Sequence, residues 1–144
     1  MACLSVSAQQ IRESILLNNG WKFAYGHAGD MKKDFTHGTE YFTYFAKAKS
    51  FNQNQGPSSE QFNDSLWQTV SLPHDWAVDL PYSEEASHSH GYKTIGWKYP
   101  ETSVGWYRRK FYIAAEDSGK HIAVRFDGIF RNAQVFLQRF LFRT

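Results

Sequence analysis

Few residues of this chain stand where they could do chemistry, and Asp75 is the first of them. It follows an alternating apolar segment and Pro73, and it stands between His74 and Trp76. A carboxylate in such a loop accepts a strong hydrogen bond from a ligand hydroxyl, or it caps the backbone of its own loop. Both interpretations remain open. Trp76 is expected to anchor the loop through packing and one N–H bond.

Two further clusters offer chemistry of other kinds. His88 and His90 form a His-Ser-His sequence, which on a strand would point both imidazoles the same way. No third ligand is identifiable, so no metal site is predicted. Glu84 and Glu85 are adjacent carboxylates of the kind that usually lies in solvent. No cofactor is predicted either.

The composition excludes several classes of protein. The 144 residues suit one domain, and the net charge of +2 comes from 16 basic and 14 acidic residues spread along the chain. The one basic cluster, at residues 108–110, lies in a strand pattern, so nucleic acid is not an expected partner. The single cysteine, Cys3, excludes an intrachain disulfide. No apolar run approaches the roughly 18 residues of a membrane span.

The first ten residues are expected to be a leader rather than part of a domain. Val-Ser-Ala at residues 6–8, followed by two glutamines, fits the end of a secretory signal peptide. A disordered terminus and a lipoprotein anchored through Cys3 are the alternatives. We therefore expect a secreted or periplasmic protein with a leader at residues 1–10 and one domain at residues 11–144.

Short alternating segments separated by turn signals predict an all-β sandwich or barrel. A short strand is expected after the turn at Gly20, and further strands are expected at residues 67–72, 105–113, 120–127 and 132–137. Residues 41–45 fit either an edge strand or a short helix. Residues 74–103 lack periodicity, and so long a loop is usually functional.

The alternation of apolar and polar residues predicts which face of each strand is buried. In residues 120–127 the apolar side chains of Ile122, Val124 and Phe126 fall on one face, which we expect to be buried. Aromatic residues make up 17% of the chain, which suits strands and also suits the stacking of sugar rings. Composition does not separate these two uses.

Three segments, in order, resemble the sugar-binding domain of family 2 glycoside hydrolases. They are residues 67–76 (Trp-Gln-Thr-Val-Ser-Leu-Pro-His-Asp-Trp), residues 105–111 (Gly-Trp-Tyr-Arg-Arg-Lys-Phe) and residues 126–137, which begin Phe-Asp-Gly-Ile. Their order and spacing make the resemblance specific. Residues 88–93, with residues 99–106 after them, look most like the β-galactosidase-type members.

The resemblance implies a jelly-roll β-sandwich of the galactose-binding type, incomplete at its C-terminal end. The family continues the third segment with an Asn-Gly hairpin turn, whereas this chain has Gln138 and Arg139. A two-residue hairpin requires positive φ angles, which these residues adopt only at a steric cost. Missing strands would leave an open sheet edge, through which we expect dimers or aggregates.

The same resemblance implies a function. Retaining glycoside hydrolysis needs two carboxyl groups about 5 Å apart, which the family carries on a downstream barrel of about 250 residues. No catalytic residue is therefore expected in this chain. The implied role is a non-catalytic domain that braces the barrel of a secreted β-galactosidase and contacts the sugar through Asp75, with His74 and Trp76 beside it. The alternative is a free-standing carbohydrate-binding module of the same fold.

Overall fold

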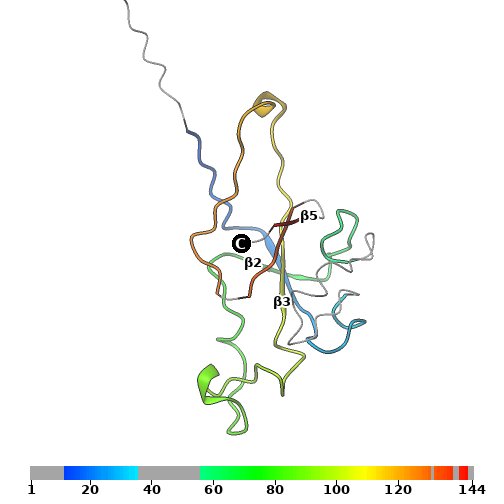
Figure 1. The fold of residues 1–144 in the computed structure, drawn as a ribbon, viewed down its shortest axis with the longest axis vertical. Coiled ribbons are helices and arrows are strands. Elements are labelled where there is room, and N and C mark those ends of the chain that lie inside the picture. The colour runs from blue at the N-terminus through cyan, green and yellow to red at the C-terminus, as the bar shows by residue number, and fades with distance from the viewer. Residues whose placement is uncertain (1–11, 36–55, 131, 138–139, 143–144) are drawn as a thin grey trace, which may run out of the picture.

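The computed structural model describes residues 12–35, 56–130, 132–137 and 140–142. Strands β1 (Trp21–Tyr25), β2 (Gln68–Val70) and β3 (Gly105–Arg108) form an antiparallel sheet in the order β2-β1-β3 (Figure 1). Strands β4 (Val135–Leu137) and β5 (Phe140–Phe142) form a second antiparallel pair. Two short 3-10 helices, η1 (His88–His90) and η2 (Ala115–Asp117), complete the elements of the described residues. The prediction of an all-β chain is confirmed.

The register of the three-stranded sheet determines which side chains lie together. Phe23 of β1 pairs with Tyr107 of β3, and Lys22 pairs with Arg108. Because successive residues of a strand point to opposite sides, these two pairs lie on opposite faces. We call the side with Phe23 and Tyr107 the loop face, and the side with Lys22 and Arg108 the clamp face.

An aromatic cluster covers part of the clamp face. The rings of Phe35, Phe62 and Trp67 lie 5.1–5.6 Å apart between centroids, and two of the three contacts are edge-on. Edge-on and tilted rings pack favourably because the positive edge of one meets the negative face of another. This cluster attaches the segment before β2 to the sheet.

A buried carboxylate attaches a second segment to the clamp face. Asp34 is fully buried and accepts a hydrogen bond from the indole Nε1 of Trp106, at 2.8 Å, and another from the backbone N–H of His27. Phe136 of β4 stacks on Trp106, with ring centroids 6.4 Å apart. The second sheet therefore contacts the clamp face through these two rings.

Arg108 holds the segment between Pro57 and Asp64 against the sheet. Its guanidinium donates to the carbonyls of Pro57 (2.6 Å) and Ser59 (2.8 Å) and forms an ion pair with Asp64. It also lies 5.4 Å from the centroid of the Phe62 ring. The planar guanidinium can reach all of these groups at once, which the single ammonium of lysine cannot do.

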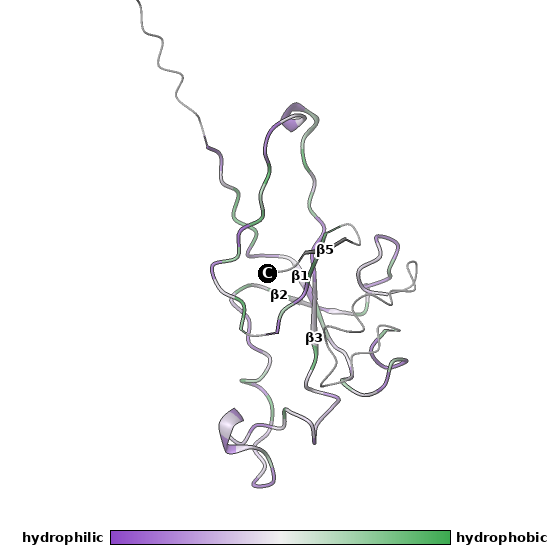
Figure 2. Cartoon of the chain, viewed as in Figure 1, coloured by the Kyte–Doolittle hydropathy of each residue, from purple (hydrophilic) through white to green (hydrophobic). Residues whose placement is uncertain are grey.

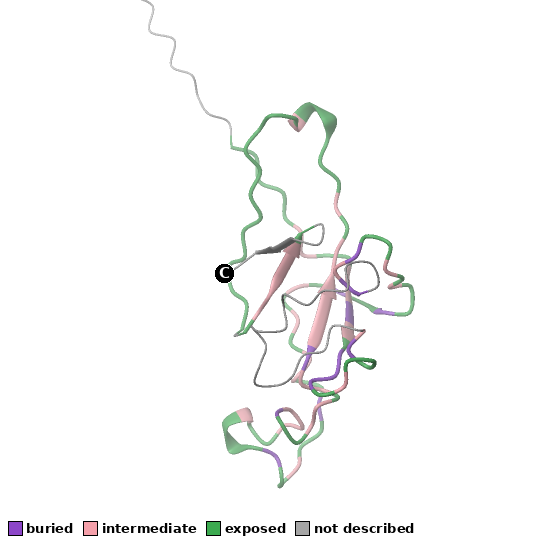
Figure 3. Ribbon diagram, turned by 45° about the vertical axis from the view of Figure 1, so that its right-hand side comes forward, coloured by how far each residue is buried: buried purple, intermediate pink, exposed green. Residues whose placement is uncertain are grey.

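Residues 109–130 leave the sheet as a long arm with η2 at its tip, and this corrects two predicted strands (Figures 1 and 3). β3 ends at Arg108 instead of residue 113, and no strand forms at residues 120–127. Ile122, Val124 and Phe126 are 48%, 46% and 41% exposed rather than buried. The physical reason is that no strand of the described ranges pairs with this segment, and a strand requires a hydrogen-bonded partner.

At the C-terminal end of the described residues, the chain forms a strand, β5, that was not predicted. The strand predicted at residues 132–137 is present as β4, and it pairs with β5 in a register that joins Leu137 to Phe140. Gln138 and Arg139, at which a steric cost was predicted, lie outside the described residues. The proposed leader at residues 1–10 and the segment at residues 41–45 lie outside the described residues. None of the described helices is long and apolar enough to cross a membrane.

Replacement of Arg108 by alanine is expected to destabilise the fold strongly. The Arg108 side chain is only 11% exposed, and its loss leaves the Asp64 carboxylate and the Pro57 carbonyl without their donor, while the Ser59 carbonyl keeps only the Phe62 N–H. Breaking such a pair typically costs about 3–5 kcal/mol. Urea denaturation followed by tryptophan fluorescence measures the change. Arg125→Ala is the matched control, because the Arg125–Asp127 pair is exposed; equal midpoints for the two variants would contradict the prediction.

Candidate functional site

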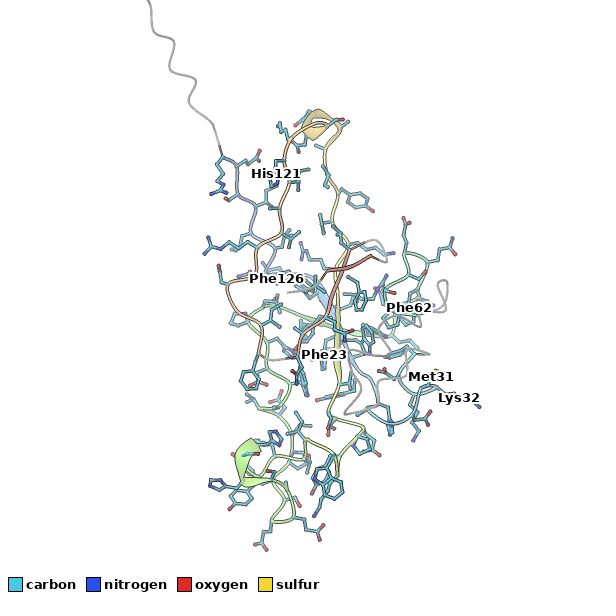
Figure 4. The ribbon with its side chains drawn as sticks, viewed as in Figure 1. Phe23, Met31, Lys32, Phe62, His121 and Phe126 are labelled. Atoms are coloured by element: carbon cyan, nitrogen blue, oxygen red, sulfur yellow. The ribbon has the colours of Figure 1, made fainter. Side chains whose placement is uncertain are left out.

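The loop at residues 73–76, which carries the three candidate site residues, lies on the loop face of the sheet. It follows β2, and the N–H of Leu72 donates to the carbonyl of Asn18 at 2.7 Å. The rings of His74 and Trp76 lie 4.9 and 5.9 Å from the ring of Phe23, the side chain at the centre of Figure 4. The loop is therefore packed against β1 instead of projecting freely into solvent.

Trp76 reaches the sheet because β3 begins with glycine. A Cβ atom on Gly105 would lie 2.8 Å from Cζ3 of Trp76, closer than real contacts allow, and 3.0 Å from Cε2 of Phe23, a tight contact. The indole Nε1 of Trp76 donates to the carbonyl of Thr102 at 2.9 Å. Trp76 thus anchors the loop through packing and one N–H bond, as its position in the sequence predicted.

His74 is tied to the neighbouring strand by its side chain and by its backbone. Its Nδ1 lies 2.7 Å from the hydroxyl oxygen of Tyr107, and the same hydroxyl lies 3.3 Å from the His74 carbonyl oxygen. Tyr107 also packs on Phe23, with centroids 5.0 Å apart. Tyr107 of β3 therefore holds both the imidazole ring and the backbone carbonyl of His74.

Asp75 is exposed, and its side chain caps the backbone of the loop. Its Oδ1 accepts the backbone N–H of Ala77 at 2.9 Å, so Asp75 does cap its own loop. Its Oδ2 makes no hydrogen bond within the described residues and lies on an exposed side chain. The cap and a contact to a sugar use different oxygens, so the first does not exclude the second. The contacts predicted from Asp75, His74 and Trp76 to a substrate remain predictions.

Two tyrosines and a second carboxylate belong to this site, and the sequence did not indicate them. Burial, and after it the charge of Asp75, raises the pKa of Tyr107 to about 12, with a further contribution from Tyr25. Burial and the charge of Asp79 raise the pKa of Tyr25. Tyr25 is placed here because β1 pairs with β3, opposite Gly105. Only that pairing could have revealed it, since nothing around Tyr25 in the sequence marks it.

The rest of the long loop is ordered by its own hydrogen bonds. The Lys93 ammonium donates to the carbonyls of Val78 and Leu80 at 2.8 and 2.7 Å. The Tyr99 hydroxyl donates to Ser83 Oγ at 3.1 Å. This loop occupies the end of the molecule opposite to the arm (Figure 1). The functional role predicted for this long loop remains a prediction.

In this loop the acidic pair and His88 are exposed, whereas His90 is half-buried. His88 and His90 lie on η1, a hydrophilic 3-10 turn in which their side chains do not project as they would from a strand (Figure 2). Among the described residues no three histidine, cysteine or acidic side chains come together as metal ligands. Glu84 and Glu85 are exposed, as their positions in the sequence suggested.

Gly105→Ala is expected to displace Trp76 and loosen the loop. The added methyl group overlaps Trp76 and Phe23, and overpacking of this kind costs about 1–3 kcal/mol. The Trp76 indole N–H resonance should shift as its bond to Thr102 lengthens, which NMR spectra of the labelled chain would detect. Gly128→Ala is the control, since a Cβ at Gly128 meets nothing within 4 Å. An unshifted indole resonance in Gly105→Ala would contradict the prediction.

The raised pKa of Tyr107 predicts a loss of stability at alkaline pH. The pKa is about 12 in the folded chain, against about 10 for an unfolded tyrosine, so folding favours the protonated phenol. This contribution is complete below pH ~10 and disappears as the pH rises through about 12. Denaturant titrations across this range should show a smaller decline for Tyr107→Phe than for the control Tyr112→Phe, whose tyrosine is exposed. Parallel declines would refute the assignment.

Comparison with known proteins relates this chain to a class of enzymes. The chain is 38% identical over 76 residues, 53% of its length, to a β-galactosidase of Bacteroides ovatus. It is 29% identical over 77 residues, 53% of its length, to a β-glucuronidase of Formosa agariphila. It is 26% identical over 135 residues, 94% of its length, to a β-glucuronidase of Bacteroides fragilis.

The matches cover only 8%, 7% and 13% of these three relatives. No family model matches the chain, and no solved structure matches it. Both kinds of enzyme name appear among the relatives, so the similarity extends beyond the β-galactosidases. The resemblance of this chain to family 2 glycoside hydrolases, predicted from its three motif segments, is confirmed over a short segment of such enzymes.

Proposed function

We propose that this chain is the non-catalytic N-terminal sugar-binding domain of a secreted family 2 glycoside hydrolase, a β-galactosidase. The observation that carries this proposal is the loop at residues 73–76, which is packed on the sheet while Asp75 keeps one carboxylate oxygen free. The similarity to a β-galactosidase and to β-glucuronidases supports the class of the parent enzyme.

The domain acts beside the catalytic residues and not in their place. Retaining hydrolysis requires two carboxyl groups about 5 Å apart on opposite sides of the scissile bond. A barrel that carries such a pair takes about 250 residues, more than the 144 of this chain. The catalytic barrel is therefore proposed as a neighbour in the same polypeptide, which this domain braces.

The proposed contact to the sugar is a single charge-assisted hydrogen bond. Asp75 Oδ1 is engaged by the Ala77 N–H, whereas Oδ2 is available to accept from a hydroxyl group of a galactoside. His74 and Trp76 flank this carboxylate and are fixed by Tyr107 and Thr102. A carboxylate held in one direction distinguishes an axial from an equatorial hydroxyl, because only one of them lies within hydrogen-bonding distance.

The same proposal includes a jelly-roll sandwich fold and secretion of the protein. The contact of Phe136 with Trp106 is what two stacked sheets of a jelly-roll sandwich require, and further strands would complete it. Secretion rests on the signal-like sequence at residues 6–8. The jelly-roll fold follows the resemblance to family 2 enzymes, whereas secretion is proposed from the leader alone.

Asp75→Asn in the polypeptide that joins this domain to its barrel is expected to lower kcat/KM for galactosides. The asparagine Oδ1 can still accept the Ala77 N–H, but an amide NH2 replaces the free oxygen and cannot accept from a sugar hydroxyl. A hydrogen bond to a charged group contributes about 1.5–3 kcal/mol, which predicts a ten- to hundred-fold loss. Asp79→Asn is the control for a change in local charge; equal losses in both would refute a specific bond.

The isolated chain gives the complementary measurement. Titration calorimetry with galactosides should detect no saturable binding, and nitrophenyl glycosides should not be hydrolysed. Saturable binding would instead favour a free-standing carbohydrate-binding module and overturn the accessory role. Turnover that survives removal of host enzymes would overturn the non-catalytic assignment.

Self-association of the isolated chain is expected from its uncovered apolar surface and sheet edges. Ile122, Val124 and Phe126 are exposed, and within the described ranges β2 and β3 each have one unpaired edge. Such features promote pairing between chains. Sedimentation velocity should show dimers or larger species that increase with concentration, and serine at the three apolar positions should reduce them. One monomeric boundary at high concentration would contradict this.

A further inference from the structure

We infer that Tyr107 is a positioning residue that holds His74 in its Nδ1–H tautomer and thereby sets the direction of Asp75. The functional part of this inference rests on the sugar contact proposed for Asp75. The structural part rests on the geometry of His74 and Tyr107 alone, and it can be tested without any sugar.

The hydrogen positions follow from the two contacts of the Tyr107 hydroxyl. Its oxygen lies 3.3 Å from the His74 carbonyl oxygen and 2.7 Å from His74 Nδ1. A carbonyl oxygen only accepts, and a phenol has a single hydrogen, so the contact with the carbonyl uses that hydrogen. The ring nitrogen must then donate, with a hydrogen on Nδ1 directed at the phenol oxygen.

This arrangement satisfies both polar groups, and its alternative does not. If the phenol donated to Nδ1 instead, it would have no hydrogen left for the His74 carbonyl. In the neutral imidazole one nitrogen donates and the other accepts, so an Nδ1–H fixes Nε2 as an acceptor. The ring is also held between Phe23 and Tyr107, with centroids 4.9 and 5.6 Å away. Rotation of His74 is therefore opposed by packing as well as by hydrogen bonding.

The charges around the pair favour the same arrangement. Burial and the negative charge of Asp75 keep the Tyr107 hydroxyl protonated at ordinary pH, so it remains able to donate. Tyr25 is the other titratable group that acts on Tyr107 from the adjacent strand. Neither of these neighbours is hydrogen-bonded to His74 within the described residues.

The consequence concerns the residue that follows His74. Because the His74 ring and carbonyl are both attached to one hydroxyl of β3, the backbone that enters Asp75 has a fixed direction. The Ala77 N–H then fixes Asp75 Oδ1 from the other side. Tyr107 does not contact the proposed sugar; it determines where the free oxygen of Asp75 lies.

Long-range proton–nitrogen NMR spectra of the 15N-labelled full chain test this inference. At mildly alkaline pH, where imidazole is neutral, His74 should show the Nδ1–H pattern. Tyr107→Phe should lose that pattern and accelerate hydrogen exchange at the Ala77 amide about ten-fold or more, because the turn opens more often. Tyr25→Phe, which removes a hydroxyl from the same face, should retain the pattern.

Two results would overturn the inference: an Nε2–H pattern in the unaltered chain, or an unchanged His74 pattern in Tyr107→Phe. The spectrum of the unaltered chain decides the tautomer even where Tyr107→Phe fails to fold. If His74 has the Nδ1–H pattern while Asp75→Asn leaves kcat/KM unchanged, the positioning stands and the sugar contact fails. The two proposals therefore fail separately.

Discussion

The contact between the loop at residues 73–76 and the aromatic ring of Phe23 determines how the candidate site is built. His74, Trp76 and Tyr107 all pack on this ring, so one side chain of the central strand positions two loop residues and one strand residue. The approach is possible because Gly105 has no side chain beneath Trp76. Aromatic rings are stiff, with few rotatable bonds, so the loop they hold loses little entropy when it meets a ligand.

The opposite side of the same sheet makes this arrangement stable. A three-stranded sheet of short strands needs a buried apolar face to persist, and here the clamp face is covered as well, by polar anchors and by rings. Asp34 accepts from Trp106, and Arg108 joins the segment before β2 to β3. Two neighbouring residues of β3 thus act on opposite faces of the sheet. Arg108 binds the segment before β2 on the clamp face, and Tyr107 holds His74 on the loop face.

The sequence predicted β1 to β4 but not β5, and it predicted a further strand at residues 120–127, which has no partner within the described ranges. Alternation located β2, β3 and β4, whereas the equally regular residues 120–127 remain unpaired, because alternation records which side a residue prefers and not whether a neighbour exists. The roles of Tyr25 and Arg108 depend on pairing between distant segments, which a single sequence does not contain. Asp75 was found through a family motif, and its loop-capping bond was expected from residue type alone.

The energetics of one hydrogen bond explain why such a site would serve an enzyme and not act alone. A hydrogen bond from a ligand hydroxyl to the second carboxylate oxygen of Asp75 would contribute about 1.5–3 kcal/mol. Even millimolar binding requires about 4 kcal/mol, and association itself costs at least that much in lost translation and rotation. A sugar that a neighbouring barrel already binds has lost its translational and rotational freedom. The whole free energy of the additional hydrogen bond would then favour one orientation of that sugar. Rigidity of the loop then matters more than the number of contacts, because a carboxylate that wanders by 1 Å no longer distinguishes one hydroxyl from another.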